Sequence, residues 1–224
     1  MSVNRISRWR VRLWLLAGAG VIALAFLLDS RVDAALAVAK NSPLQPVAWW
    51  ISKSAEGEMV GGAGVLFAAI FLVLNRPGAA SRIFFAAASG LLVGLAGTIL
   101  RVLTGRTRPP LHGSAGVPQG FYGVWHDGHW IIGKAAFNSF PSGHSAVAAG
   151  LAVAAWLVHR GWGAAAAVYA LAVMWSRLAL QWHHLSDVVA SAVLAVPLAM
   201  LLKPLLLPSV EFQFGNLNRV LRKK

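Results

Sequence analysis

The chain has 224 residues, of which 58% are hydrophobic and only 12% are charged, about half the roughly 25% that is usual in globular proteins. This composition excludes a soluble domain, and the absence of cysteine excludes disulfides, thiolate metal sites and a cysteine nucleophile. The formal net charge of +13 indicates an anionic partner. Because the apolar majority needs lipid around it, we expect no nucleic acid partner and favour a membrane protein acting at an anionic headgroup or phosphate.

Six apolar stretches approach the about 20 residues that a membrane-spanning helix needs. In chain order they are Leu13–Leu28, Met59–Leu74, Ile83–Leu100, Ser145–Val158 (extendable back to Pro141), Ala164–Leu180 and Val188–Leu207. The sequence therefore predicts an all-α fold, a six-transmembrane-helix bundle that forms a single domain over residues 1–224.

Basic residues predict how this bundle is oriented, because cytoplasmic loops are enriched in Lys and Arg. They gather before the first stretch, between the second and third, between the fourth and fifth, and at the end of the chain: Arg5, Arg8, Arg10, Arg12, Arg76, Arg82, Arg160, Arg219, Arg222, Lys223 and Lys224. With six spans, all of these clusters fall on one side. We predict a multi-pass protein of a bacterial-type inner (plasma) membrane, with segments 29–58, 101–144 and 177–187 facing the periplasm.

The first stretch has two interpretations. Arginines before a short apolar run also resemble a secretory signal, but we favour an uncleaved first span. Segment 29–58 holds four of the seven acidic residues and predicts a short interfacial helix, with Trp49 and Trp50 in the headgroup zone. Segment 109–140, rich in Gly, Pro, His and aromatic residues, is expected to form an ordered outer loop.

Three polar clusters stand at the outer ends of helices three to six, within 101–109, 140–144 and 176–187. Charged side chains beside a bilayer are costly and therefore mark functional candidates. Guanidinium groups match phosphate oxygens bidentately. A phosphate group is the ligand that these clusters favour.

The third cluster offers a nucleophile. His183 and Asp187 are four residues apart, so on a helix they share a face, and the carboxylate can orient the ring and leave one nitrogen bare. His184 lies three residues before Asp187 and could take the same role. A polar helix end without chemistry is the alternative to both.

The other clusters offer phosphate ligands and an acid. Ser142 is a predicted N-cap, Gly143 lets a ligand approach the helix start, and His144 could donate a proton to a leaving oxygen. Arg101 and Arg108 lie at the end of helix three. We interpret Arg106, between them, as an arginine that snorkels to the interface.

Taken together, the clusters resemble the type 2 phosphatidic acid phosphatase (PAP2) superfamily. Its signatures are Lys-x6-Arg-Pro, Pro-Ser-Gly-His and Ser-Arg-x5-His-x3-Asp. This sequence has Arg101-x6-Arg108-Pro109, then the run 141–144, then Ser176-Arg177-x5-His183-x3-Asp187, in the same order. The one departure is Arg101, where the family usually has Lys, and a cationic phosphate contact survives that change.

The resemblance implies a metal-independent lipid phosphatase with no cofactor and a phosphohistidine intermediate. His183, rather than His184, would attack phosphorus, Asp187 would orient it, and His144 would act as acid and then base. The phosphate oxygens would be bound by Arg101, Arg108, Arg177, Ser142 and Gly143. The partner would be a phosphorylated membrane lipid in the bilayer: phosphatidic acid, phosphatidylglycerophosphate, an isoprenyl diphosphate or a lipid A phosphate.

Other readings remain open. The same intermediate could pass its phosphoryl group to another lipid, which would make the protein a phosphotransferase. The arginines could instead serve a non-catalytic transporter of anionic lipids, and a haloperoxidase-like activity is a remote option. His126, Asp127 and His129, with His112 nearby, could ligate zinc, although the spacing is loose and the expected metal assignment is none.

Overall fold

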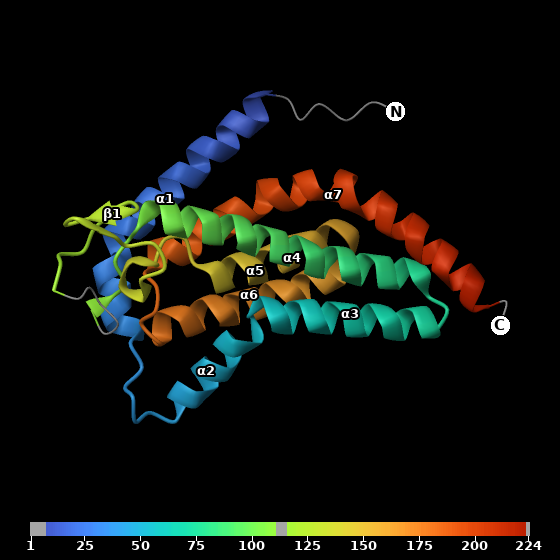
Figure 1. The fold of residues 1–224 in the computed structure, drawn as a ribbon, viewed down its shortest axis with the longest axis horizontal. Helices are drawn as coiled ribbons and strands as arrows, with labels where there is room; N and C mark the ends of the chain where they lie inside the picture. The colour runs from blue at the N-terminus through green and yellow to red at the C-terminus, as the bar shows by residue number, and fades with distance from the viewer. Residues whose placement is uncertain (1–7, 111–115, 223–224) are drawn as a thin grey trace.

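A computed structural model describes residues 8–110 and 116–222, so Arg5, His112, Lys223 and Lys224 lie outside the described residues. The described helices are α1 (Arg8–Leu36), α2 (Leu44–Ser54), α3 (Gly57–Val73), α4 (Pro77–Thr104), α5 (Gly143–Val158), α6 (Arg160–Ala179) and α7 (Leu185–Leu221). Two short strands, β1 (Trp125–His126) and β2 (His129–Trp130), and the 3-10 turn η2 (Ala135–Phe137) lie between α4 and α5. The prediction of an all-α bundle is confirmed (Figure 1).

Each predicted apolar stretch falls in a helix of its own, but the helices differ in length. Within the described residues, four are long and apolar enough to cross a membrane: Arg12–Leu36 of α1, α4, α6 and α7. A fifth span results if α2 and α3, bent by 62° at a short break, are taken together. α5 is apolar but has only 16 residues. The chain is a multi-pass membrane protein, whereas the count of six spans stays a prediction.

The helix α5 lies at the centre and packs against α4, α6 and α7. Small residues allow the close contact with α4, because a Cβ on Gly94 would lie 2.3 Å from Val147 Cγ2 and one on Gly150 would lie 2.8 Å from Val93 Cβ. Apolar helices in lipid associate through such close backbone approach. The packing holds the first residues of α5 beside the last turns of α4.

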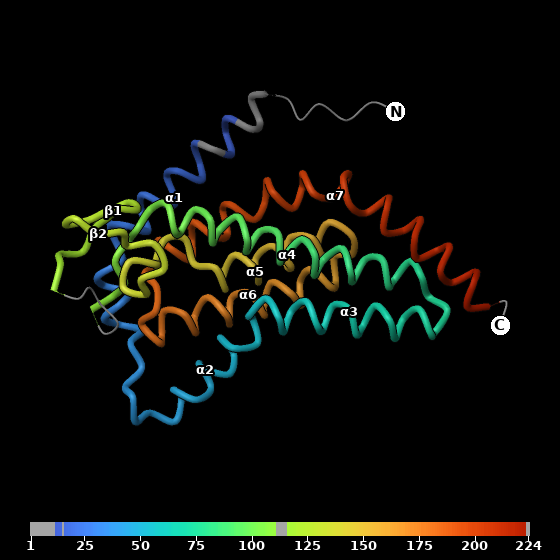
Figure 2. The backbone as a smooth tube through the Cα atoms, viewed as in Figure 1, coloured from blue at the N-terminus to red at the C-terminus, as the bar shows by residue number. Residues whose placement is uncertain are grey.

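The helix ends follow from local sequence. α4 begins at Pro77, whose fixed φ suits a first helical residue, and stops at Gly105, which has φ 56° in the left-handed region. α5 begins after Ser142, whose hydroxyl caps it. α7 contains Pro197, Pro204 and Pro208 and follows a curved path in Figures 1 and 2.

The bundle has two chemically different ends. One carries the hairpin, the C-terminal ends of α4 and α6 and the N-terminal ends of α5 and α7 (Figure 1). At the other, the turn between α3 and α4 meets the last turns of α7, where Arg222 Nε donates to Asn75 Oδ1 at 2.9 Å. The three polar clusters therefore share one end, and Arg76 and Arg222 share the other. Which side of the membrane each end faces stays a prediction.

The first helix is longer than predicted: α1 continues past Leu28 to Leu36, so Asp29 and Asp33 belong to it. The loop after α4 contains a hairpin in which Trp125 pairs with Trp130. The short helix expected in segment 29–58 is present as α2, with Trp49 and Trp50 exposed.

Candidate active site

Main-chain hydrogen bonds tie the three polar clusters together at the hairpin end. The backbone N–H of Ser139 donates to the carbonyl of Arg106 at 3.1 Å, and that of Ser142 donates to the carbonyl of Asp187 at 3.2 Å. The hydroxyl of Thr104, in the last turn of α4, donates to the carbonyl of Phe140 at 2.5 Å. Segments 101–108, 139–144 and 183–187 thus form one site.

His183 lies in the short connection between α6 and α7 and is completely buried. Its Nδ1 is 2.8 Å from the carbonyl oxygen of Ser139 and 3.4 Å from Asp187 Oδ2. A carbonyl only accepts hydrogen bonds, so Nδ1 carries the proton and Nε2 keeps its lone pair. Nε2 is buried and, among the described residues, has no partner.

The charge state of His183 suits a nucleophile. Burial lowers its pKa to about 3; the nearby Arg177 and Arg108 act in the same direction, against the hydrogen bond and charge of Asp187. The ring is therefore neutral near pH 7. A bare Nε2 on a neutral ring is able to attack an electrophile.

His184 is not equivalent to its neighbour. Its Nδ1 is 2.6 Å from Asp33 Oδ2 in α1, and its Nε2 is 3.3 Å from the carbonyl oxygen of Thr107. Both ring nitrogens are therefore engaged by acceptors. Of the two histidines that spacing left open, the structure gives a free nitrogen only to His183.

Three guanidinium groups act on the two histidines of the site. Arg177 and Arg108 interact electrostatically with His183, and Arg101 joins them in interacting with His144. The Nε atoms of the three arginines are buried and without a hydrogen-bond partner in the described part of the chain. Buried donors normally have partners, so these unpaired groups fit an anionic ligand.

Contacts with neighbouring side chains fix the positions of Arg177 and Arg108. Arg177 Nη1 donates to the hydroxyl of Ser52 in α2 at 2.5 Å. The guanidinium of Arg108 lies 4.6 Å from the ring centroid of Trp182, and that of Arg177 lies 5.7 Å from it. Burial, with Arg101 adding to it, lowers the pKa of Arg108 to about 10, which leaves it cationic near pH 7.

The start of α5 completes the arrangement. Ser142 is buried, and its hydroxyl accepts from the backbone N–H of Ser145 at 3.4 Å. A Cβ on Gly143 would lie 3.3 Å from Arg101 Nη1, so glycine lets that guanidinium approach the helix start. His144 follows, partly exposed at the wall of a pocket.

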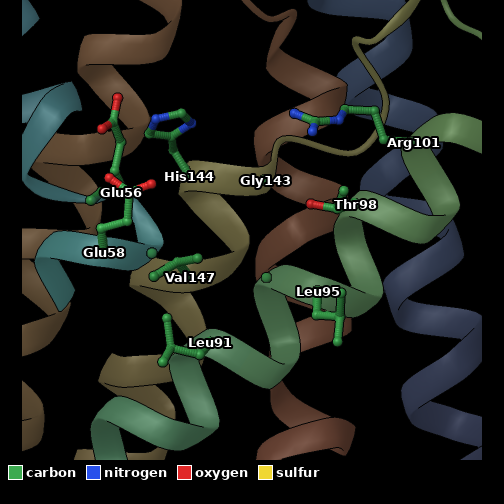
Figure 3. Close-up of a pocket in the computed structure, with 12 residues that line it drawn as sticks. Glu56, Glu58, Leu91, Leu95, Thr98, Arg101, Gly143, His144 and Val147 are labelled. Atoms are coloured by element: carbon green, nitrogen blue, oxygen red, sulfur yellow. The ribbon is translucent and has the colours of Figure 1, made fainter. Parts of the chain in front are cut away.

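The pocket has a volume of about 450 Å³ and lies between α3, α4 and α5. Figure 3 shows Arg101 and Thr98 along one side of the pocket and His144, Glu56 and Glu58 along the other. Apolar side chains lie below them: Leu91, Leu95 and Val147. The pocket thus joins the polar site to an apolar wall.

Asp187 is the best connected group of the site. Its carboxylate accepts from the guanidinium of Arg106, from the Ser139 hydroxyl at 2.5 Å and from the His184 backbone N–H at 2.8 Å. The interpretation of Arg106 as a snorkelling arginine is wrong, because its side chain is buried among three phenyl rings and paired with Asp29 and Asp187.

Sequence reasoning missed Asp29, Asp33, Arg106 and Ser139. Asp29 and Asp33 are four residues apart on one face of α1, a pattern visible in the sequence and unusual beside an apolar run.

The alternative zinc site receives no support. Within the described ranges, no group of three or more His, Cys, Asp or Glu side chains could hold a metal ion. The ring of His126 packs on Tyr122 at 4.4 Å, and His129 Nδ1 contacts the carbonyl oxygen of Asp127 at 2.6 Å.

Comparison with known proteins gives a family and a fold. The model of the PAP2 superfamily matches residues 80–207, more than half of the chain. The crystal structure of Aquifex aeolicus LpxE aligns with a TM-score of 0.51 at 18% identity, over 78% of this chain and 94% of that chain.

A second solved structure is the first transmembrane PAP2 type phosphatidylglycerolphosphate phosphatase from Bacillus subtilis. It aligns with a TM-score of 0.38 at 24% identity, over 82% of this chain and 94% of that one. No curated protein matches the sequence.

Proposed function

Because the chain belongs to the PAP2 superfamily, we propose that it hydrolyses a phosphomonoester or diphosphate of a membrane lipid, without a metal ion and through a phosphohistidine intermediate. One observation carries the proposal. His183 Nε2 is buried and unpartnered in the described residues, and the Nε atoms of Arg101, Arg108 and Arg177 in the same site are also buried without partners. A transporter needs such cations but not a bare, oriented ring nitrogen.

In the first step, the lipid phosphate binds to Arg101, Arg108 and Arg177, with Ser142 and the Gly143 N–H completing the cradle. His183 Nε2 attacks phosphorus, so that an N–P bond forms and the bond from phosphorus to the leaving oxygen breaks. Before the lipid binds, burial and then the charge of Arg177 lower the pKa of His144 to about 3, so the bound phosphate monoanion first protonates this ring. His144 then donates that proton to the leaving oxygen. Positioning and charge neutralisation are the main demands of phosphoryl transfer, and the guanidinium groups meet the second.

In the second step, water replaces the lipid. His144, now neutral, takes a proton from the water as its oxygen attacks phosphorus, and the N–P bond breaks to release inorganic phosphate. Throughout both steps the proton stays on His183 Nδ1, which donates it in a hydrogen bond to the Ser139 carbonyl. Asp187 offsets the positive charge that the ring acquires.

The substrate classes are phosphatidic acid, phosphatidylglycerophosphate, isoprenyl diphosphates and lipid A phosphates. The pocket supports a lipid, because its polar end holds Arg101 and His144 while Leu91, Leu95 and Val147 offer an apolar wall to the chain. The proposed setting is a bacterial-type inner membrane with the site facing the periplasm. The proposed unit is the whole chain, because α1 contributes contacts to the site.

The test is phosphate release by purified protein in EDTA, across these four lipid classes. The His183→Gln variant removes the nucleophile, and His159→Gln, at the opposite end of the bundle, is the matched control. We expect wild-type protein and the control to release phosphate, and His183→Gln to bind lipid but release none. Strict dependence on added magnesium, or release by His183→Gln at the wild-type rate, would refute the mechanism.

A phosphotransferase is distinguished by its acceptor. The same assay repeated with an added lipid alcohol would then yield a phosphorylated lipid in place of free phosphate. Hydrolysis predicts that phosphate release is unchanged by the added alcohol.

A further inference from the structure

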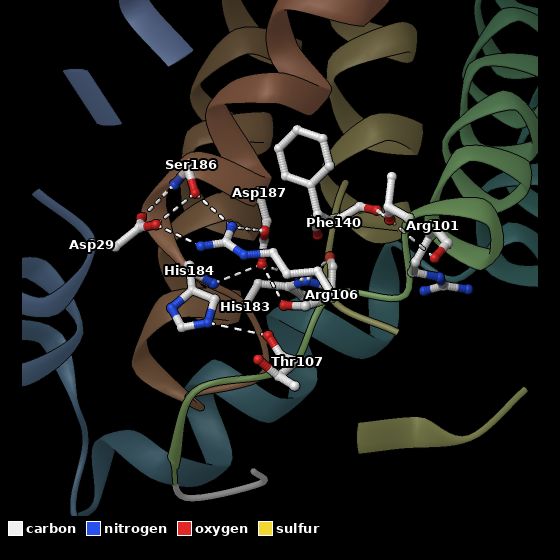
Figure 4. A network of polar contacts seen from close by, with 12 residues as sticks. Asp29, Arg101, Arg106, Thr107, Phe140, His183, His184, Ser186 and Asp187 are labelled. Atoms are coloured by element: carbon white, nitrogen blue, oxygen red, sulfur yellow. Dashed lines mark hydrogen bonds and ion pairs between the residues drawn. The ribbon is translucent and has the colours of Figure 1, made fainter. Parts of the chain in front are cut away.

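A buried charge cluster lies directly behind the nucleophile, and the proposed steps make no use of most of it. Figure 4 shows Arg106 between Asp29 of α1 and Asp187 of α7. Arg106 Nη2 donates to Asp29 Oδ2 at 2.7 Å, and Nη1 donates to Asp187 Oδ1 and to the Ser186 hydroxyl. One cation is thus shared by two carboxylates.

The surroundings fix this guanidinium in place. Its carbon lies 4.6 Å from the ring centroid of Phe26, 5.3 Å from that of Phe121 and 5.9 Å from that of Phe140. Arg106 is only 7% exposed. In such apolar surroundings its interactions with the carboxylates are weakly screened, and loss of the cation would leave two buried negative charges together.

Asp29 also holds the start of α7. Its Oδ1 accepts from the Ser186 backbone N–H at 2.8 Å, and its Oδ2 accepts from the Ser186 hydroxyl at 2.7 Å. The first helix therefore contacts both the cation that binds Asp187 and the residue that precedes Asp187.

We propose that Arg106, held by Asp29, is a positioning residue that keeps Asp187 ionised and aimed at the His183 ring during phosphoryl transfer. The inference rests on the proposed function.

The two oxygens of the Asp187 carboxylate have different partners, which supports this role. Asp187 Oδ1 accepts from Arg106, which leaves Oδ2 for the Ser139 hydroxyl, the His184 N–H and the His183 ring. Without Arg106, Oδ1 has no remaining described donor, and burial then favours the protonated, neutral form of Asp187. The imidazolium that forms on His183 would then lose its counter-charge.

The test separates positioning from folding by following kcat and KM apart. The variants are Arg106→Met, Arg106→Lys and Asp29→Asn, with Arg160→Met at the other end of the bundle as the matched control. The assay uses short-chain phosphatidic acid in detergent micelles, or the best substrate of the panel, with rates normalised to folded protein. Orthovanadate inhibition measures whether the phosphate cradle is intact.

We expect kcat to fall about 10- to 100-fold in Arg106→Met, the range found for groups that orient metal ligands. KM and the vanadate inhibition constant should stay within about threefold. Arg106→Lys should recover part of the loss, and Asp29→Asn should show the same pattern more weakly. If Arg106→Met does not fold, the Lys and Asn variants decide by the same criteria.

A double-mutant cycle with Asp187→Asn gives the decisive number. If Arg106 acts through Asp187, adding Arg106→Met to Asp187→Asn costs less than about threefold. Multiplied losses, an unchanged kcat in Arg106→Met, or losses confined to KM would overturn the inference. Wild-type protein that releases no phosphate would instead overturn the proposed function, so the two failures are distinguishable.

Discussion

Replacing Asp187 by Asn tests how the His183 ring is oriented. In a Ser-His-Asp triad the carboxylate is the partner of Nδ1, and its change to Asn costs about 10⁴-fold because the ring adopts the wrong tautomer. Here the Ser139 carbonyl lies closer to Nδ1 than Asp187 does, at 2.8 Å against 3.4 Å. The carbonyl keeps the tautomer when the carboxylate is removed.

The expected loss is therefore only that of the counter-charge. A hydrogen bond to a charged group contributes about 1.5–3 kcal/mol, and this energy, lost from the transition state, lowers kcat roughly 10- to 150-fold. The amide of the new side chain also faces donors at both oxygen positions, so we expect a lower melting temperature.

The assay is initial-rate phosphate release from short-chain phosphatidic acid in micelles, normalised to folded protein. Glu211→Gln, a carboxylate change on the exposed far part of α7, is the matched control and should stay within about twofold. A loss of 10⁴-fold or more would show that Asp187 alone sets the tautomer. A loss below threefold would show that it carries no counter-charge.

Three further predictions concern the surroundings of the site. Gly105→Ala should destabilise the protein by more than about 2 kcal/mol, because Gly105 has φ 56° and a Cβ would lie 1.9 Å from the Gly123 carbonyl oxygen. The control is Gly62→Ala, whose Cβ would meet nothing within 4 Å. Equal melting temperatures of the two variants in detergent would contradict this prediction. The folded protein lowers the pKa of His183 from its ordinary 6.5 to about 3, so between these pH values the unfolded chain binds one proton more. Stability is therefore retained above pH 6.5 and lost as pH falls toward 3, by up to about 1.4 kcal/mol per pH unit. The melting temperature of His183→Gln should depend less on pH over this window than that of wild-type protein, and an equal dependence would count against the prediction. Arg101→Lys should keep phosphate release within about fivefold while Arg101→Ala loses more than about 100-fold, and equal losses would argue that charge at this position is not what binds phosphate.

The helices were the most predictable part of the fold. Runs such as Ile83–Leu100 have no other stable environment than a helix in lipid, and the structure places that run inside α4. The ends were predictable where chemistry marks them, as with Ser142 before α5. The extension of α1 to Leu36 was not, because a charged residue such as Asp29 normally ends an apolar span.

The site was predictable where partners are close in sequence. His183 and Asp187 are only four residues apart, and their motif spacing carried the resemblance. The expectation that both lie on one helix is wrong for His183, which precedes the N-cap of α7. Arg106 was misread because its partners, Asp29 and Asp187, are 77 and 81 residues away. Ser139 was not predicted for a different reason. It contacts His183 through its backbone carbonyl, which every residue type has.

The contact between Asp29 and Ser186 has a consequence for biosynthesis. These residues are 157 positions apart, so the ribosome delivers one near the beginning of translation and the other after most of the chain has entered the membrane. An incomplete nascent chain cannot assemble the cluster behind His183. The proposed active site is therefore complete only once the start of the last helix has been made.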